Sequence, residues 1–148
     1  MKRFRRITAI TLALVVIAML GISASAASFS RNVPGDFGVG VGAVFNGNLT
    51  TSQAWASAAF YGAQEEGIDL VYQQIVIDGQ SVSQDTPYDF KRIEANQKIY
   101  DNDAVGALAP ASTDYDIQYA TYTYNAYYIA NGVIDCYMND GPVRLNNP

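Results

Sequence analysis

The sequence predicts an all-β fold, an antiparallel β-sandwich of about six or seven strands. Three observations carry this prediction. Apolar and polar residues alternate with a period of two over several segments, and Asn-Gly and Asp-Gly pairs, which are typical of hairpin turns, separate them. Seven of the eleven tyrosines lie between Tyr115 and Tyr137, where tyrosine and threonine, both good strand formers, dominate the composition.

Residues 1–26 are expected to be a secretory signal peptide rather than part of the sandwich. A basic start, Lys2 to Arg6, precedes the uncharged run Ile7 to Ile22, and Ala24-Ser25-Ala26 supplies the small-x-small cleavage pattern. The run has sixteen residues, whereas a spanning helix needs about 20. We therefore expect a secreted, extracellular protein with no membrane span after cleavage, an N-terminal extension over 27–36 and a single sandwich domain over 37–148.

The charge balance bears on partners. Removing residues 1–26 takes four of the nine Lys and Arg and leaves five against fourteen Asp and Glu, a net charge of −9. A nucleic-acid partner requires a basic surface, so none is expected. This acidity favours solubility and, if anything, cationic partners.

The first strands are predicted from alternation and turn residues. Residues 38–45 alternate glycine with small apolar residues and meet Asn46-Gly47-Asn48, which predicts a hairpin turn. The alanine-rich segment 49–61 admits a helix, but bounding turn residues favour a strand. Residues 68–78 carry apolar residues on both faces, which predicts a central strand covered on both sides, and Asp78-Gly79 predicts the next turn of an antiparallel meander.

The middle of the chain leaves an alternative open. Thr86-Pro87 resembles a helix start, and several residues up to Tyr100 follow helical spacing, so one short helix over 87–100 competes evenly with a strand. Residues 101–111 are expected to be loop, with a short extended piece at 105–108. Asp101 and Asp103 resemble the opening of a calcium loop, but a hydrogen-bonded turn is favoured because Val105 and Ser112 replace essential ligands.

A long terminal hairpin is predicted over 115–138, turning at Asn131-Gly132. Alternation places Tyr115, Ile117, Tyr119 and Tyr127 on one face and Tyr122, Tyr124 and Tyr128 on the other. The resulting number of strands matches a sandwich of Ig-like dimensions, with a small barrel as the alternative.

Catalysis is not expected. The chain has no histidine and one cysteine, which removes Ser-His-Asp and Cys-His machinery and nearly every zinc site. We expect no cofactor and no metal. Cys136 is expected to be a small buried apolar side chain, with an intermolecular disulfide as the alternative.

The tyrosine-rich hairpin is the candidate binding feature. Buried hydroxyls need partners, so some of these rings are expected to be exposed and to contact a cell-surface or extracellular glycan or protein. The candidate residues are Tyr115, Tyr119, Tyr122, Tyr124, Tyr127 and Tyr128. A secreted bacteriocin-like effector is the alternative function, and a surface-assembly subunit is a weaker one. The sequence leaves the oligomeric state open.

Overall fold

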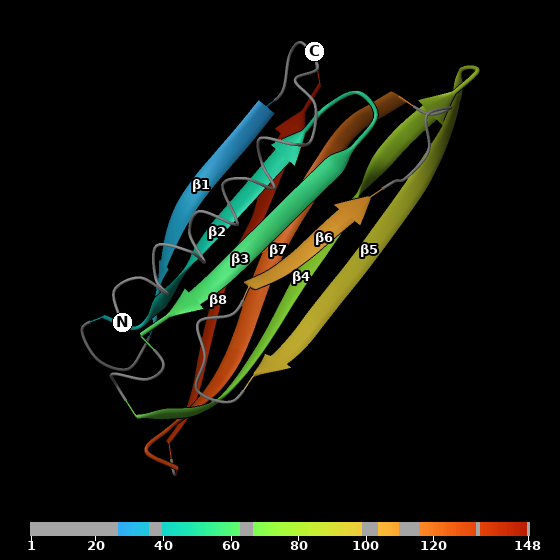
Figure 1. Ribbon diagram of the computed structural model, residues 1–148. Coiled ribbons are helices and arrows are strands. Elements are labelled where there is room, and N and C mark those ends of the chain that lie inside the picture. Colours follow the sequence, from blue (N-terminus) through green and yellow to red (C-terminus); the bar gives the residue numbers. More distant parts are fainter. Residues whose placement is uncertain are drawn as a thin grey trace.

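The protein is a sandwich of two four-stranded antiparallel sheets (Figure 1). The computed structural model describes residues 27–35, 40–62, 67–98, 104–109, 116–132 and 134–147, and all its regular elements in these ranges are strands. The first sheet has the order β1-β2-β3-β6 and the second the order β5-β4-β7-β8. The predicted all-β antiparallel sandwich is therefore confirmed, with eight strands rather than six or seven.

The two sheets differ in the length of their strands. The first sheet contains β1 (Ala27–Pro34), β2 (Gly42–Leu49), β3 (Ala54–Tyr61) and β6 (Ala104–Ala109). The second contains β4 (Ile68–Ser83), β5 (Thr86–Lys98), β7 (Asp116–Ala130) and β8 (Ile134–Asn146). Because the second sheet is built from longer strands, it extends past the first, and the β4–β5 hairpin projects at one end (Figure 1).

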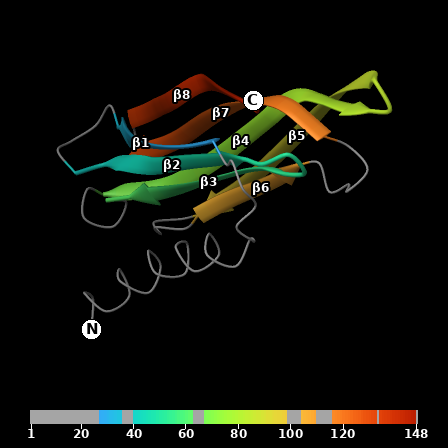
Figure 2. The same ribbon diagram turned by 90° about the horizontal axis from the view of Figure 1, so that it is seen from above.

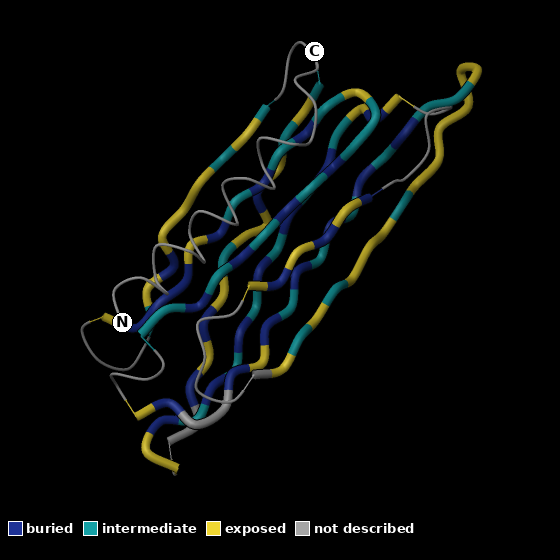
Figure 3. Tube along the Cα trace, in the orientation of Figure 1, coloured by how far each residue is buried: buried dark blue, intermediate teal, exposed yellow. Residues whose placement is uncertain are grey.

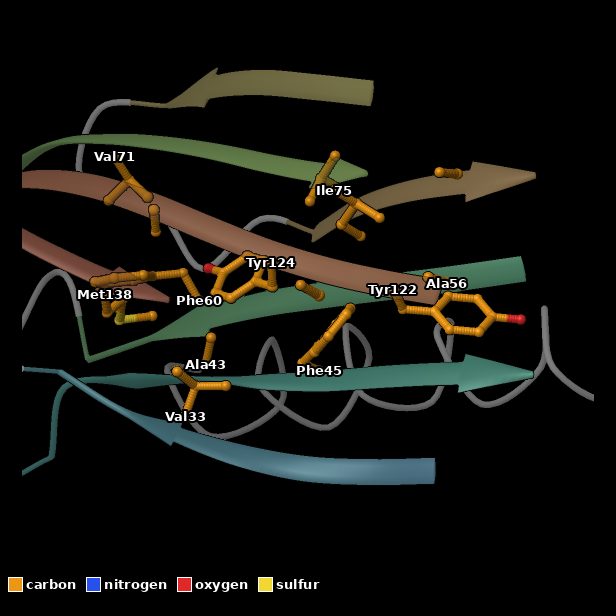
Figure 4. Packing of buried hydrophobic residues seen from close by; sticks show 14 of the residues in the cluster. Val33, Ala43, Phe45, Ala56, Phe60, Val71, Ile75, Tyr122, Tyr124 and Met138 are labelled. Carbon is orange, nitrogen blue, oxygen red and sulfur yellow. The ribbon is translucent and has the colours of Figure 1, made fainter. Parts of the chain in front are cut away.

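The core lies between the sheets, which are stacked face to face (Figure 2). Buried and half-buried residues alternate along β3 and β7, as a strand with one covered face requires (Figure 3). Aromatic rings fill the centre (Figure 4). Phe45 stacks on Tyr124 with centroids 5.6 Å apart, and Phe60 meets Tyr128 edge to face at 5.3 Å. Alanines of β3 leave room for these rings, which explains the alanine-rich composition of that strand.

Each edge strand of the first sheet lies beside an edge strand of the second. β5 lies beside β6, where the Asn96 side-chain amide donates to the Ala104 carbonyl at 2.9 Å. β1 lies beside β8, where the Arg31 guanidinium pairs with the Asp140 carboxylate at 3.1 Å. Within the described ranges, no helix is long and apolar enough to cross a membrane.

One predicted boundary is wrong. Residues 27–34 are not an extension outside the domain, because β1 pairs with β2 along its whole length, from Ala27 opposite Leu49 to Pro34 opposite Gly42. Of the two alternatives left open for 87–100, the strand is the one observed, because β5 pairs with β4 from Thr86 to Lys98. In both segments the strand is held by backbone pairing with its neighbour. The short extended piece at 105–108 is confirmed as β6.

Of the three predicted hairpin turns, one is confirmed and two are wrong. Asn131-Gly132 joins β7 and β8, with φ of 51° and 70° as a tight hairpin requires. The chain instead runs straight through Asn46-Gly47-Asn48 and turns at 50–53. It also runs through Asp78-Gly79 and turns at Gln84-Asp85, whose φ values are 49° and 61°.

Close packing explains the two misread glycines. A Cβ on Gly47 would lie 2.2 Å from a ring carbon of Phe29, and one on Gly79 would lie 2.2 Å from the Tyr119 carbonyl oxygen. Both glycines are therefore sites of close approach within a strand rather than turn residues.

The predicted meander is interrupted, because β3 and β4 belong to different sheets. β4 is central in its sheet, between β5 and β7, but only one of its faces is covered by the other sheet. Val71, Ile75 and Ile77 are buried in the core, whereas Tyr72 on the opposite face is 38 % exposed. Cys136 is buried, as expected. Asp101 and Asp103 lie outside the described residues.

Candidate binding surface

The six candidate tyrosines are divided between the interior and the surface. Tyr122, Tyr124 and Tyr128 are fully buried, so their rings belong to the core and are not available to a partner. Tyr119 and Tyr127 lie half-buried on the outer face of the second sheet. Tyr115 lies outside the described residues.

The buried tyrosines correct the expectation that all six contribute to a binding surface. The Tyr122 hydroxyl donates to the Asn48 carbonyl at 2.7 Å, and the Tyr124 hydroxyl donates to Oε1 of Gln73 at 2.8 Å. These acceptors come from β2 and β4 and satisfy hydroxyl groups that would otherwise be costly to bury. Burial also raises the pKa of both tyrosines above the ordinary value, so both stay neutral.

A register irregularity changes the predicted faces of β7. Gln80 pairs with Tyr119, but the next residue of β4, Ser81, pairs with Ile117, so Gln118 is an extra residue on β7. An extra residue moves the following side chain to the other face. Ile117 is accordingly buried in the core instead of sharing the outer face with Tyr119.

A row of three tyrosines crosses the outer face of the second sheet. Tyr72 on β4 pairs with Tyr127 on β7, and Tyr127 pairs with Tyr137 on β8, so the three side chains lie on one face in adjacent strands. The rings of Tyr127 and Tyr137 lie 5.1 Å apart and are tilted by 49°. Tyr137 is 63 % exposed, the most exposed of the large apolar and aromatic side chains in the described ranges. We call these three residues the tyrosine row.

A row of amides lies directly beside the tyrosine row. Gln74 pairs with Asn125, and Asn125 pairs with Asn139, one step of two residues along the same three strands. Gln74 and Asn125 are half-buried and Asn139 is exposed. Each side chain offers one carbonyl acceptor and two N–H donors. We call these residues the amide row.

The opposite end of this outer face contains an open hollow of about 410 Å³. Its lining residues are Asp78, Gly79, Asp89, Phe90, Lys91 and Tyr119. The Tyr119 ring is held from the β8 side by the Arg144 guanidinium, whose central carbon lies 3.6 Å from the ring centroid. The Gln80 amide donates to Asp89 at 3.1 Å and fixes the carboxylate at the far wall.

Sequence reasoning missed the contributions of β4 and β8 to this surface. Tyr72 belongs to the segment 68–78 that is predicted to be covered on both faces, and nothing local to it shows that β4 pairs with β7 in the register that aligns it with Tyr127. Tyr137 was counted with the terminal hairpin without being a candidate. A two-residue turn at Asn131-Gly132 would place Tyr127 opposite Cys136, whereas β7 and β8 pair one residue further along, with Ala130 opposite Ile134 and Tyr127 opposite Tyr137. The turn position alone therefore does not give this alignment.

The described residues contain no group of three or more Cys, Asp and Glu side chains placed to hold a metal ion. The arrangement therefore offers aromatic faces, amides and one small charged hollow on a sheet surface. Comparison with models of protein families, with curated proteins and with solved structures finds no match in any of the three.

Proposed function

We propose that this protein is an extracellular, non-catalytic binding protein that recognises a carbohydrate through the outer face of its second sheet. The observation that carries the proposal is the tyrosine row beside the amide row, in register across β4, β7 and β8. The terminal hairpin is part of this surface, but through the faces of Tyr127 and Tyr137 rather than through its buried tyrosines.

The chemistry of the two rows suits a sugar ring. A pyranose presents a face of C–H bonds, which packs against an aromatic ring, and a rim of hydroxyl groups, each of which donates and accepts hydrogen bonds. Tyrosine supplies large, rigid, amphipathic contact area. Asn and Gln supply both donors and acceptors from one planar group, which matches a hydroxyl in either role.

A location outside the cell is part of this proposal. It rests on the basic start, the apolar run and the Ala24-Ser25-Ala26 pattern of residues 1–26. The first strand of the sandwich begins at Ala27, the residue after that pattern. A cleavage there would leave every strand of the two sheets intact.

A glycan array and retention on insoluble cell-wall polysaccharide test the proposal. The purified protein is expected to be retained, and Tyr72→Ala and Tyr137→Ala are each expected to weaken binding by about 5-fold or more, since truncating an aromatic side chain that anchors a ligand costs roughly 1 kcal/mol or more. Tyr88→Ala is the matched control, because Tyr88 is 46 % exposed on β5 and is not part of the rows.

Two outcomes would count against the proposal. One is an array with no retained glycan. The other is binding that Tyr88→Ala weakens as much as Tyr137→Ala does, because the tyrosine row would then have no special role. Growth inhibition of neighbouring bacteria by protein that binds no glycan would favour the effector alternative instead.

A further inference from the structure

We propose that the ligand is an uncharged linear glycan, extended along the strands from the tyrosine row to the hollow beside Tyr119, which forms a second subsite. This inference rests on the proposed function and specifies the class of its ligand. Three observations support it: the two sites share one face, the surface between them is formed by short side chains, and the charges around the hollow cancel.

The two sites lie on one face because β7 connects them. Tyr127 of the tyrosine row and Tyr119 of the hollow are eight residues apart on β7 and have the same strand parity. At about 3.4 Å per residue, eight residues span about 27 Å, which corresponds to roughly five sugar units in an extended chain. The bulge at Gln118 lies beyond Tyr119, so it does not disturb the alignment.

The surface between the two sites is formed by short side chains. On β7 these are Thr121, Thr123 and Asn125, all half-buried. Their partners on β4 include Val76 and Asp78, also half-buried. Between the two sites no tyrosine, phenylalanine or tryptophan of β4 or β7 faces outward, because Tyr122 and Tyr124 point into the core, so an extended chain can lie flat along these strands. The exposed side chain of Ile93 on β5 borders this surface on one side.

The hollow suits a sugar with free hydroxyl groups. Its volume of about 410 Å³ falls within the roughly 300–1,000 Å³ range of small-molecule sites. Asp78 and Asp89 offer carboxylate acceptors and Lys91 offers donors. The Tyr119 ring forms a wall on the β7 side, where Arg144 covers its other face.

The charges indicate that the glycan is uncharged. Across the hollow and its border, Asp78 and Asp89 balance Lys91 and Arg144. Residues 27–148 together carry nine more acidic than basic side chains, so a polyanionic glycan would be repelled as it approached. A neutral chain avoids that cost and uses the carboxylates as hydrogen-bond acceptors.

Isothermal titration with two ladders of neutral oligosaccharides tests the inference: N-acetylglucosamine oligomers and β-1,4-linked glucose oligomers, each from dimer to hexamer. We expect at least one ladder to bind, with affinity rising 10-fold or more from the dimer to the pentamer and then reaching a plateau. Joining two subsites in one ligand raises affinity until the ligand spans both of them.

Single substitutions test whether the tyrosine row and the hollow bind opposite ends of the glycan. Tyr119→Ala is expected to lower hexamer affinity 5-fold or more and to leave dimer affinity unchanged, because the dimer occupies the tyrosine row alone. Tyr137→Ala is expected to weaken both ligands, and Tyr88→Ala neither. Thermal melts of each variant show that the fold is retained. Affinity should change less than twofold between 50 and 500 mM NaCl, since no ionic contact with the ligand is involved.

Distinct results would overturn the inference and the proposed function. Equal affinities for dimer and hexamer, or hexamer binding unaffected by Tyr119→Ala in a folded variant, would refute the extended ligand while leaving carbohydrate binding intact. Binding of heparin or hyaluronan in place of both neutral ladders, with strong salt dependence, would refute the uncharged class. Binding of no glycan, on the array or in either ladder, would refute both proposals.

Discussion

Removing the buried hydrogen bond between Tyr124 and Gln73 tests directly how the core of this protein is stabilised. Both side chains are buried, Gln73 being 1 % exposed, and the hydroxyl of Tyr124 donates to Oε1 of Gln73 at 2.8 Å. The bond joins β7 to β4, the two central strands of the second sheet. Tyr124→Phe removes one oxygen and leaves the ring stacked on Phe45.

The magnitude follows from what the substitution leaves behind. A net intramolecular hydrogen bond contributes about 0.5–1.5 kcal/mol, and a buried acceptor deprived of its partner costs about 1–3 kcal/mol. We therefore expect Tyr124→Phe to lower the free energy of unfolding by about 2 kcal/mol. At roughly 4 °C per kcal/mol for a domain of this size, the melting temperature should fall by about 8 °C.

Two matched variants separate the hydrogen bond from the general effect of losing a hydroxyl. Tyr122→Phe removes a bond to the Asn48 carbonyl that is only partly buried, where water can replace the donor, so about 1 kcal/mol is expected. Tyr137→Phe changes an exposed hydroxyl and should stay within about 0.5 kcal/mol of the original protein. Urea unfolding followed by tryptophan fluorescence measures all three.

A double-mutant cycle with Gln73→Met, which keeps the length of the side chain, completes the experiment. The coupling energy between positions 73 and 124 should be about 1 kcal/mol or more, because the two side chains are in direct contact. A coupling energy near zero, or a Tyr124→Phe variant as stable as Tyr137→Phe, would show that this bond adds nothing to stability and would refute the reasoning.

Two further predictions concern stability. Burial raises the folded-state pKa of Tyr122 and Tyr124 above 10, so the folded protein keeps protons that the unfolded chain releases at alkaline pH. The free energy of unfolding should therefore be unaffected below about pH 9 and should fall by about 3 kcal/mol in total by pH 11. Urea unfolding at each pH measures this change. The Tyr122→Phe/Tyr124→Phe double variant should lose this alkaline decline, and an identical decline in that variant would exclude these two groups as its cause. Gly47→Ala should cost about 1–3 kcal/mol, because the new Cβ would meet the Phe29 ring at 2.2 Å and displace it from Phe45 and Tyr122; a thermal melt unchanged from the original protein would contradict this packing.

The sequence was informative where one local signal agreed with its surroundings. Asn131-Gly132 lies between two alternating segments of matching length, and the hairpin forms there because positive φ is inexpensive at both residues. The same reasoning failed at Asp78-Gly79 and Asn46-Gly47, because glycine also serves close approach inside a strand. Which role applies depends on whether a ring or carbonyl of another strand occupies the space of the missing Cβ.

The candidate surface was predicted only in part for a similar reason. Alternation correctly separated Tyr127 from Tyr122, Tyr124 and Tyr128, but a period of two does not say which face is covered. Alternation does not reveal the hydrogen-bond partners of the buried tyrosines. Asn48 accepts from Tyr122 across 74 residues of sequence, and Gln73 accepts from Tyr124 across 51.

The amino-acid sequence by itself determined that this chain forms an antiparallel sandwich, where its terminal hairpin turns, and that histidine chemistry is absent, because composition, strand propensity and turn residues act locally. Only the tertiary structure decided that β3 and β4 lie in different sheets, that β1 completes the first of them, and that three tyrosines face the core while Tyr72, Tyr127 and Tyr137 align on the surface. The physical reason is that strand pairing and the burial of one face of a sheet depend on contacts between segments far apart in the sequence. No single segment contains the information that determines them.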